Sequence, residues 1–101
     1  MIRKNRKCIA IPPGETLREQ LKERGISQCE LARRTHLSEK HISHLLNGNV
    51  QLTARTALLL EIVLGIPAGY WLRLEATYRE KLARIQFENE PEYAKLVLAN
   101  A

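Results

Sequence analysis

Apolar residues recur along most of the chain with the three- and four-residue spacing of amphipathic helices. The first such segment covers about 15–24 and stops at Gly25, a residue that suits a helix C-terminus. Two shorter segments follow at about 28–34 and 39–47, with only a short turn between them. The pattern therefore predicts three helices in the first half of the chain.

The ends of the two shorter segments carry residues that commonly cap helices. Ser27 and Glu30 form the Ser-x-x-Glu pattern of a capping box just before an apolar run. Ser38 offers a second hydroxyl cap, and Asn47 with Gly48 favours a helix stop. These caps predict two short helices rather than one continuous helix.

A fourth helix is predicted between Thr53, which can cap its start, and Gly65, which can end it. This is the most apolar segment of the chain, so we expect it to lie at the centre of the core. The residues that make it so apolar are Leu58, Leu59, Ile62 and Val63.

The longest predicted helix covers about 68–86 and starts after Pro67, a residue favoured at helix starts. Apolar residues recur along it near heptad spacing. This stripe consists of Trp71, Leu74, Tyr78, Leu82 and Ile85. Its first half either closes the monomer core or joins the second half in an interface between two copies. The last pattern, at 93–101, is either a sixth helix or a frayed tail.

Together these segments predict an all-α protein with one domain, a size that 101 residues allow. We expect a five-helix domain at 13–86, a basic arm before it at 1–12, and a short helix or tail after it at 87–101. Sixteen Lys and Arg against eleven Asp and Glu give a net charge of +5, which favours a polyanionic partner such as nucleic acid. The basic residues of the arm either follow DNA or only keep the protein soluble. They are Arg3, Lys4, Arg6 and Lys7.

The chain lacks the motifs of several other classes of protein. No run approaches the roughly 18 apolar residues of a membrane span, and the basic start does not lead into a signal-peptide core. We therefore expect a cytoplasmic protein without a membrane partner. The three histidines lack zinc-finger spacing, and Cys8 and Cys29 are expected to be ordinary reduced thiols, so no metal or cofactor is predicted. The absence of HExxH and GxSxG disfavours an enzyme of any kind, and no small-molecule substrate is expected.

Two short helices joined by a tight turn are typical of the helix-turn-helix, whose second helix enters the major groove of double-stranded DNA. If Ile42, Leu45 and Leu46 face the core, the other side of this second helix carries hydrogen-bonding groups. The outward residues are then Glu39, Lys40, Ser43, His44 and Asn47.

Each polar residue suits a particular part of the duplex. Lys40 can donate to guanine, and His44 can donate or accept, so both can read base edges. Glu39 either accepts from cytosine N4 or only favours the helix N-terminus through its charge. Gln28 starts the preceding helix, where its side chain and nearby backbone N–H groups can contact a phosphate.

The stretch SQCELARRTHLSEKHISHLLNG resembles the lambda-repressor-like (Cro/XRE) helix-turn-helix family. Its flanks, PPGETLREQL before it and LTARTALLLEIVLGIPAGYWLRLEATYREKL after it, resemble the HigA antitoxin group, also called VapI-like, across about 12–84. This resemblance implies a repressor of its own operon that also neutralises a HigB-type toxin, a small ribonuclease.

The same resemblance implies base-reading roles for Glu39, Lys40 and His44, and phosphate-binding roles for Gln28, Ser43 and Asn47. The chain departs from the commonest family pattern at Cys29 and at His36, where the turn more often holds Gly. We interpret His36 as a turn residue in the left-handed conformation rather than as a ligand.

A homodimer is expected because one helix-turn-helix reads only a few base pairs, whereas two half-sites of a palindromic operator combine their binding free energies. The predicted dimer interface is Tyr78, Leu82 and Ile85. Two other interpretations stay open. The chain also resembles the N-terminal module of regulators with an ImmA-type peptidase, which would make it a stand-alone transcriptional regulator with no toxin. Alternatively, it is chiefly a protein-binding antitoxin whose DNA-facing side is vestigial.

Overall fold

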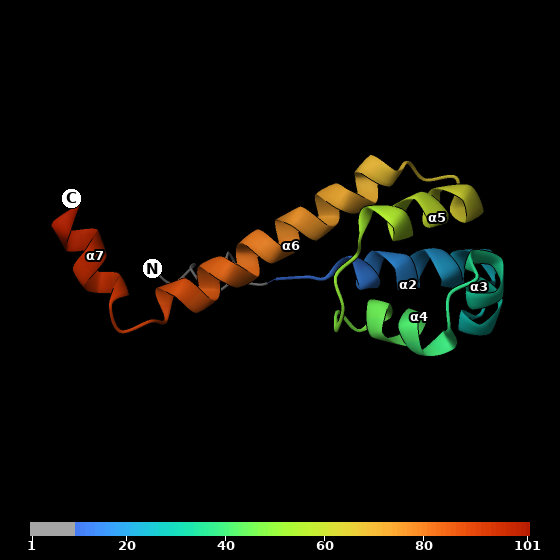
Figure 1. Cartoon of the computed structure of the whole chain (residues 1–101), viewed down its shortest axis with the longest axis horizontal. Helices are drawn as coiled ribbons and strands as arrows, with labels where there is room; N and C mark the ends of the chain where they lie inside the picture. The colour runs from blue at the N-terminus through green and yellow to red at the C-terminus, as the bar shows by residue number, and fades with distance from the viewer. Residues whose placement is uncertain (1–9) are drawn as a thin grey trace.

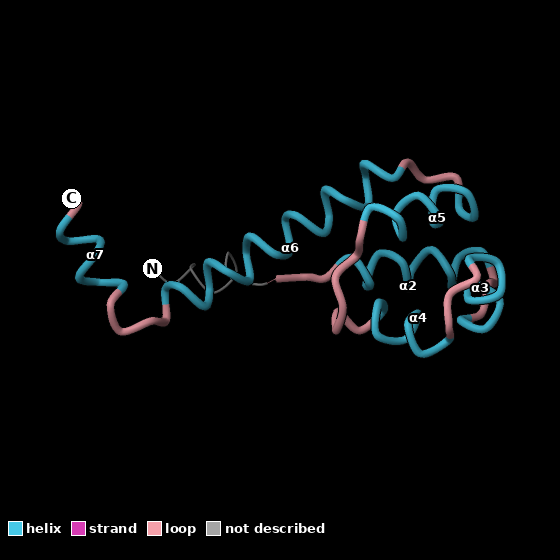
Figure 2. Tube along the Cα trace, in the orientation of Figure 1, coloured by secondary structure: helices cyan, strands magenta, loops and turns pink. Residues whose placement is uncertain are grey.

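The computed structural model describes residues 10–101, which fold into six helices joined by loops (Figures 1 and 2). They are α2 (Pro13–Arg24), α3 (Gln28–Thr35), α4 (Glu39–Leu46), α5 (Ala54–Leu64), α6 (Ala68–Glu88) and α7 (Tyr93–Ala99). The predicted all-α fold is confirmed, since the described residues contain no strand. Most of the predicted basic arm, including its four basic side chains, lies outside the described residues.

The helices begin and end close to the predicted caps. Gly25 and Gly65 adopt the left-handed conformation, with φ of 67° and 75°, directly after α2 and α5. The hydroxyl of Thr53 accepts a hydrogen bond from the N–H group of Thr56 at the start of α5. Helix α4 ends one residue earlier than predicted, because Asn47 is its C-cap rather than its last helical residue.

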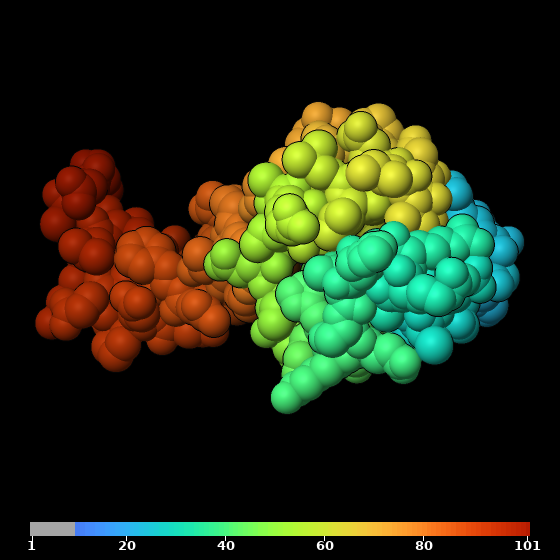
Figure 3. Space-filling view, turned by 45° about the vertical axis from the view of Figure 1, so that its right-hand side comes forward, coloured from blue at the N-terminus to red at the C-terminus, as the bar shows by residue number. Residues whose placement is uncertain are grey.

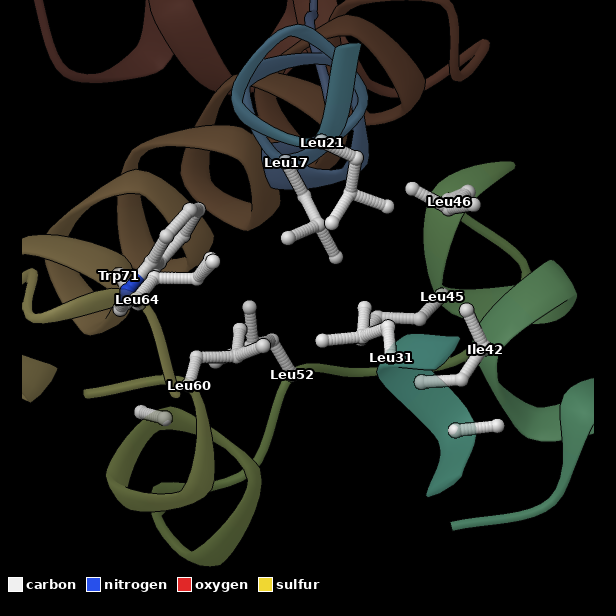
Figure 4. Packing of buried hydrophobic residues seen from close by; sticks show 12 residues of the cluster. Leu17, Leu21, Leu31, Ile42, Leu45, Leu46, Leu52, Leu60, Leu64 and Trp71 are labelled. Atoms are coloured by element: carbon white, nitrogen blue, oxygen red, sulfur yellow. The ribbon is translucent and has the colours of Figure 1, made fainter. Parts of the chain in front are cut away.

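The core lies where α2, α3, α4, α5 and the first half of α6 meet (Figure 4). Helix α3 packs against α4 and α5, while α2 packs against α4 and α6. The largest fully buried side chains are Trp71, Leu17, Leu31, Ile42, Leu45, Leu46 and Leu60. Trp71 is 0% exposed, so the start of the α6 stripe belongs to the monomer core.

Helix α5 contributes to the core, but not through the four residues that marked it as the most apolar segment. Ile62 is 79% exposed and Leu58 is 53% exposed, and the other two members are only half-buried. The core-facing side of α5 instead carries Thr56, Ala57, Leu60 and Leu64. This helix is apolar nearly all round, so its sequence pattern does not mark one face as buried. The buried face is the one that packs against α3 and α6.

The second half of α6 extends beyond the core and carries α7 at its end (Figure 1). The molecule measures 52 × 25 × 23 Å, and its radius of gyration of 16.8 Å exceeds the roughly 13 Å of a compact domain of this length. Phe87 and Tyr93 hold the two helices together through an edge-to-face contact with ring centroids 5.2 Å apart. Because α7 covers Tyr93–Ala99, the segment at 93–101 is helical over most of its length. Within residues 10–101, no helix combines the length and apolar character that crossing a membrane requires.

Candidate nucleic-acid interface

Helices α3 and α4 form two capped helices joined by a tight turn. The Ser27 hydroxyl accepts a hydrogen bond of 3.0 Å from the Glu30 N–H group, and the Ser38 hydroxyl accepts one of 3.0 Å from the His41 N–H group. Between them, His36 adopts the left-handed conformation with φ of 62°, as predicted. The turn continues with the Leu37 N–H group, which donates to the Ala32 carbonyl at 3.1 Å. This geometry is that of a helix-turn-helix.

Helix α4 has one buried side and one exposed side. Ile42, Leu45 and Leu46 are at most 2% exposed and anchor the helix to α2 and α3. Helix α4 lies at the molecular surface in the space-filling view (Figure 3). Glu39 and Lys40 are exposed at its start, and the neighbouring polar residues of its outer side, Ser43 and His44, are half-buried. The outer side can therefore offer both hydrogen-bond donors and acceptors to a partner.

The N-terminus of α3 lies beside the N-terminus of α4. Cys29, the second residue of α3, and Glu39, the first residue of α4, are near enough for the carboxylate to affect the thiol. The Glu39 carboxylate raises the pKa of the Cys29 thiol, chiefly by accepting a hydrogen bond from it and also through its negative charge. Gln28 is exposed at the first position of α3.

The C-terminus of α4 is linked to α2 by a contact that the sequence did not predict. Arg18 of α2 donates from Nη2 to Oδ1 of Asn47 at 3.0 Å, and more weakly to the Leu46 carbonyl at 3.5 Å. Both Arg18 and Asn47 are exposed. Because the two residues are 29 positions apart, no local pattern marks the pair.

The predicted interface residues Tyr78, Leu82 and Ile85 lie on α6, and all three are half-buried. Tyr78 lines a groove of about 300 Å³ between α6 and the segment at 11–16, and the Arg79 guanidinium lies 4.9 Å from its ring centroid. The other two residues are on the part of α6 that extends beyond the core. Tyr78 also approaches the loop that follows α4, because its hydroxyl would lie 3.7 Å from a Cβ atom added at Gly48.

The described residues contain no group of three or more His, Cys, Asp or Glu side chains that could hold a metal ion.

A helix-turn-helix family model matches residues 17–71, which is more than half of the chain and includes all of α3, α4 and α5. The chain therefore belongs to the helix-turn-helix family of Cro/XRE type, and it is a DNA-binding transcriptional regulator. Within that family it belongs to the HigA/VapI-like group.

Three relatives support this placement. Virulence-associated protein I of Dichelobacter nodosus is 40% identical over 75 residues, which are 73% of this chain and 69% of that protein. An addiction module antidote protein of the HigA family from Coxiella burnetii is similar with a TM-score of 0.70 and 32% identity, over 81% of this chain and 97% of that one. Antitoxin HigA of Pseudomonas aeruginosa, solved with the higBA promoter, gives a TM-score of 0.71 at 30% identity, over 82% and 98% of the two chains.

Proposed function

We propose that this protein is a HigA-type antitoxin that represses transcription of its own operon in the cytoplasm and neutralises a HigB-like ribonuclease toxin. The observation that carries the DNA-binding part is the exposed polar side of α4, held in place by three buried apolar residues on the opposite side. The HigA protein solved with a promoter supports the same use of this fold.

In this proposal the outer side of α4 reads base edges in the major groove. Lys40 and His44 donate to base acceptors, and Glu39 accepts from cytosine. Phosphate contacts come from groups at the helix ends and edges. They are Gln28, Ser43 and Asn47.

The DNA-bound form is a homodimer on a palindromic operator. We assign the interface to Tyr78, Leu82 and Ile85, because α6 extends beyond the core there and keeps these apolar side chains only half covered. A two-fold axis between two α6 helices would leave one α4 on each protomer for each half-site.

Fluorescence anisotropy tests the DNA-binding part directly. The protein is titrated onto a duplex from the region upstream of its own gene and onto a shuffled duplex, across a salt series. We expect tight and selective binding, with log K falling by about 0.9 for each phosphate neutralised per unit of log salt. Equal, weak binding to both duplexes would contradict autoregulation.

The antitoxin part is tested by co-expression with small reading frames beside the gene. We expect one of them to arrest growth alone, to degrade messenger RNA, and to lose this effect with the antitoxin present. If no such neighbour exists while selective DNA binding holds, the protein is a stand-alone regulator.

A further inference from the structure

Arg18 lies at the end of α4, although it belongs to α2. Its Nη2 group donates to Oδ1 of Asn47 at 3.0 Å, and Asn47 is the C-cap of α4. The same nitrogen lies 3.5 Å from the Leu46 carbonyl, one of the unpaired carbonyls at that helix end. The guanidinium thus contacts both the backbone and the side chain at the last turn of α4.

This contact fixes which half of the Asn47 amide faces outward. A guanidinium has only N–H donors, so it can face the amide oxygen and not the amide NH2 group. With Oδ1 directed at Arg18, Nδ2 points away from it. In the part of the chain that the structure describes, no acceptor takes a hydrogen bond from Nδ2, and the residue is exposed.

The outward group matters because phosphate oxygens only accept hydrogen bonds. An unrestrained asparagine amide can rotate by half a turn and present its oxygen instead, which would repel a phosphate. We propose that Arg18 is a positioning residue that holds the Asn47 amide with its NH2 group toward a DNA phosphate. This inference rests on the proposed function, in which Asn47 contacts the backbone of DNA.

A direct phosphate contact by Arg18 is the competing explanation, because the guanidinium has further N–H groups. The two roles differ in a measurable way. A positioning residue acts only through Asn47, whereas a direct contact adds its own neutralised phosphate and its own salt dependence.

A double-mutant cycle separates them. Fluorescence anisotropy is measured for the full-length wild-type protein, Arg18→Met, Asn47→Ala and the double variant, across a salt series. We expect each single variant to bind about tenfold more weakly, as loss of one charge-assisted hydrogen bond implies, and the double variant to bind no more weakly than Asn47→Ala. The salt slope of Arg18→Met should equal that of the wild type.

Arg24→Met is the matched control, because Arg24 is also an exposed arginine of α2 but pairs with Gln20 of the same helix at 3.2 Å. Its affinity should stay close to that of the wild type. A urea midpoint for each variant verifies folding, and Arg18→Ala replaces Arg18→Met if the latter aggregates. Multiplicative losses in the double variant, or a slope lowered by about 0.9 in Arg18→Met, would overturn the positioning role.

The cycle is also run on a random duplex at low salt, because phosphates are the same in every sequence. It therefore reports on Asn47 even if the operator is not found. A wild-type protein that does not select its upstream duplex counts against the proposed function, whereas independent losses in a protein that binds count against the positioning role alone.

Discussion

A Cβ atom at Gly14 would lie 2.3 Å from the carbonyl oxygen of Leu46, so α2 and α4 meet with their backbones in direct contact. A Gly14→Ala side chain has no room there, because the nearest atoms are backbone and cannot rotate away. We expect this variant to lose about 2–3 kcal/mol of unfolding free energy through overpacking. A urea titration followed by circular dichroism measures the change.

Gly69→Ala provides the matched control for this experiment. Gly69 is the second residue of α6, as Gly14 is of α2, and a methyl group added there would have as its nearest neighbour the flexible Arg73 Nη1 at 3.7 Å. Alanine should be neutral or stabilising by up to about 1 kcal/mol, since it has the higher helix propensity. Equal losses in both variants would mean that the close approach of α2 to α4 is not the cause.

Helix ends were predictable because their causes are local. A hydroxyl at Ser27, Ser38 or Thr53 bonds a backbone N–H group three residues later, so the signal lies within a few letters of sequence. The side of α5 that is buried was not predictable, because a helix that is apolar nearly all round fits several packings. Its core-facing residues depend on neighbours that are distant in sequence.

The candidate site divides in the same way. The outward place of Glu39 and Lys40 followed from the apolar spacing of α4, which fixes both sides of a helix at once. The Arg18 contact with Asn47 did not, because it joins two helices whose relative position is decided only by the folded core. Base and phosphate roles for the individual residues stay predictions until the complex is tested.

His36→Gly should stabilise the protein. His36 adopts φ of 62°, a conformation in which a Cβ atom is strained and glycine is not. We expect a gain of about 0.5–1 kcal/mol, partly offset by the greater freedom of glycine in the unfolded chain. Thermal unfolding should show a rise of a few degrees for a domain of this size.

Gly25→Ala is the reverse test of the same effect. Gly25 has φ of 67°, and a Cβ atom added to it would meet nothing within 4 Å, so only backbone strain is added. A loss of about 1 kcal/mol is expected. If His36→Gly does not stabilise while Gly25→Ala destabilises, the His36 side chain must make a compensating contribution of its own.

The reactivity of Cys29 should depend on Glu39. Because the Glu39 carboxylate raises the pKa of the Cys29 thiol, less thiolate is present at a given pH, and alkylation by iodoacetamide is slowed. Glu39→Gln should lower that pKa and move the pH–rate profile toward lower pH, so the rate at neutral pH rises. A Cys8→Ser background restricts the signal to Cys29. Glu30→Gln should shift the profile less, since Glu30 is the smallest of the named causes.

Lys40→Ala should weaken binding to the operator much more than binding to random duplex. One base contact is worth about 1–3 kcal/mol of discrimination, whereas a phosphate contact affects all sequences alike. Substitution of Gln28 by Ala provides the contrast, because a phosphate role predicts nearly equal losses on both duplexes. Equal losses for Lys40→Ala, measured by anisotropy at one salt concentration, would contradict base reading by that residue.

Leu82→Glu should convert a dimer into a monomer. The side chain is half-buried on the part of α6 that extends beyond the core, so a charge there would be enclosed by the partner but tolerated in the free chain. Analytical ultracentrifugation measures the mass. Affinity for the palindromic operator should fall as well, because the two half-sites are no longer bound by one linked molecule.

Leu58→Glu tests the other exposed apolar surface with the same change of charge. Leu58 is 53% exposed on α5 and is not among the assigned interface residues, so this variant should remain a dimer and bind the operator as the wild type does. The opposite result, with Leu58→Glu monomeric and Leu82→Glu dimeric, would place the two-fold axis on α5. The spacing between the two α4 helices would then differ, and the preferred distance between half-sites would change with it.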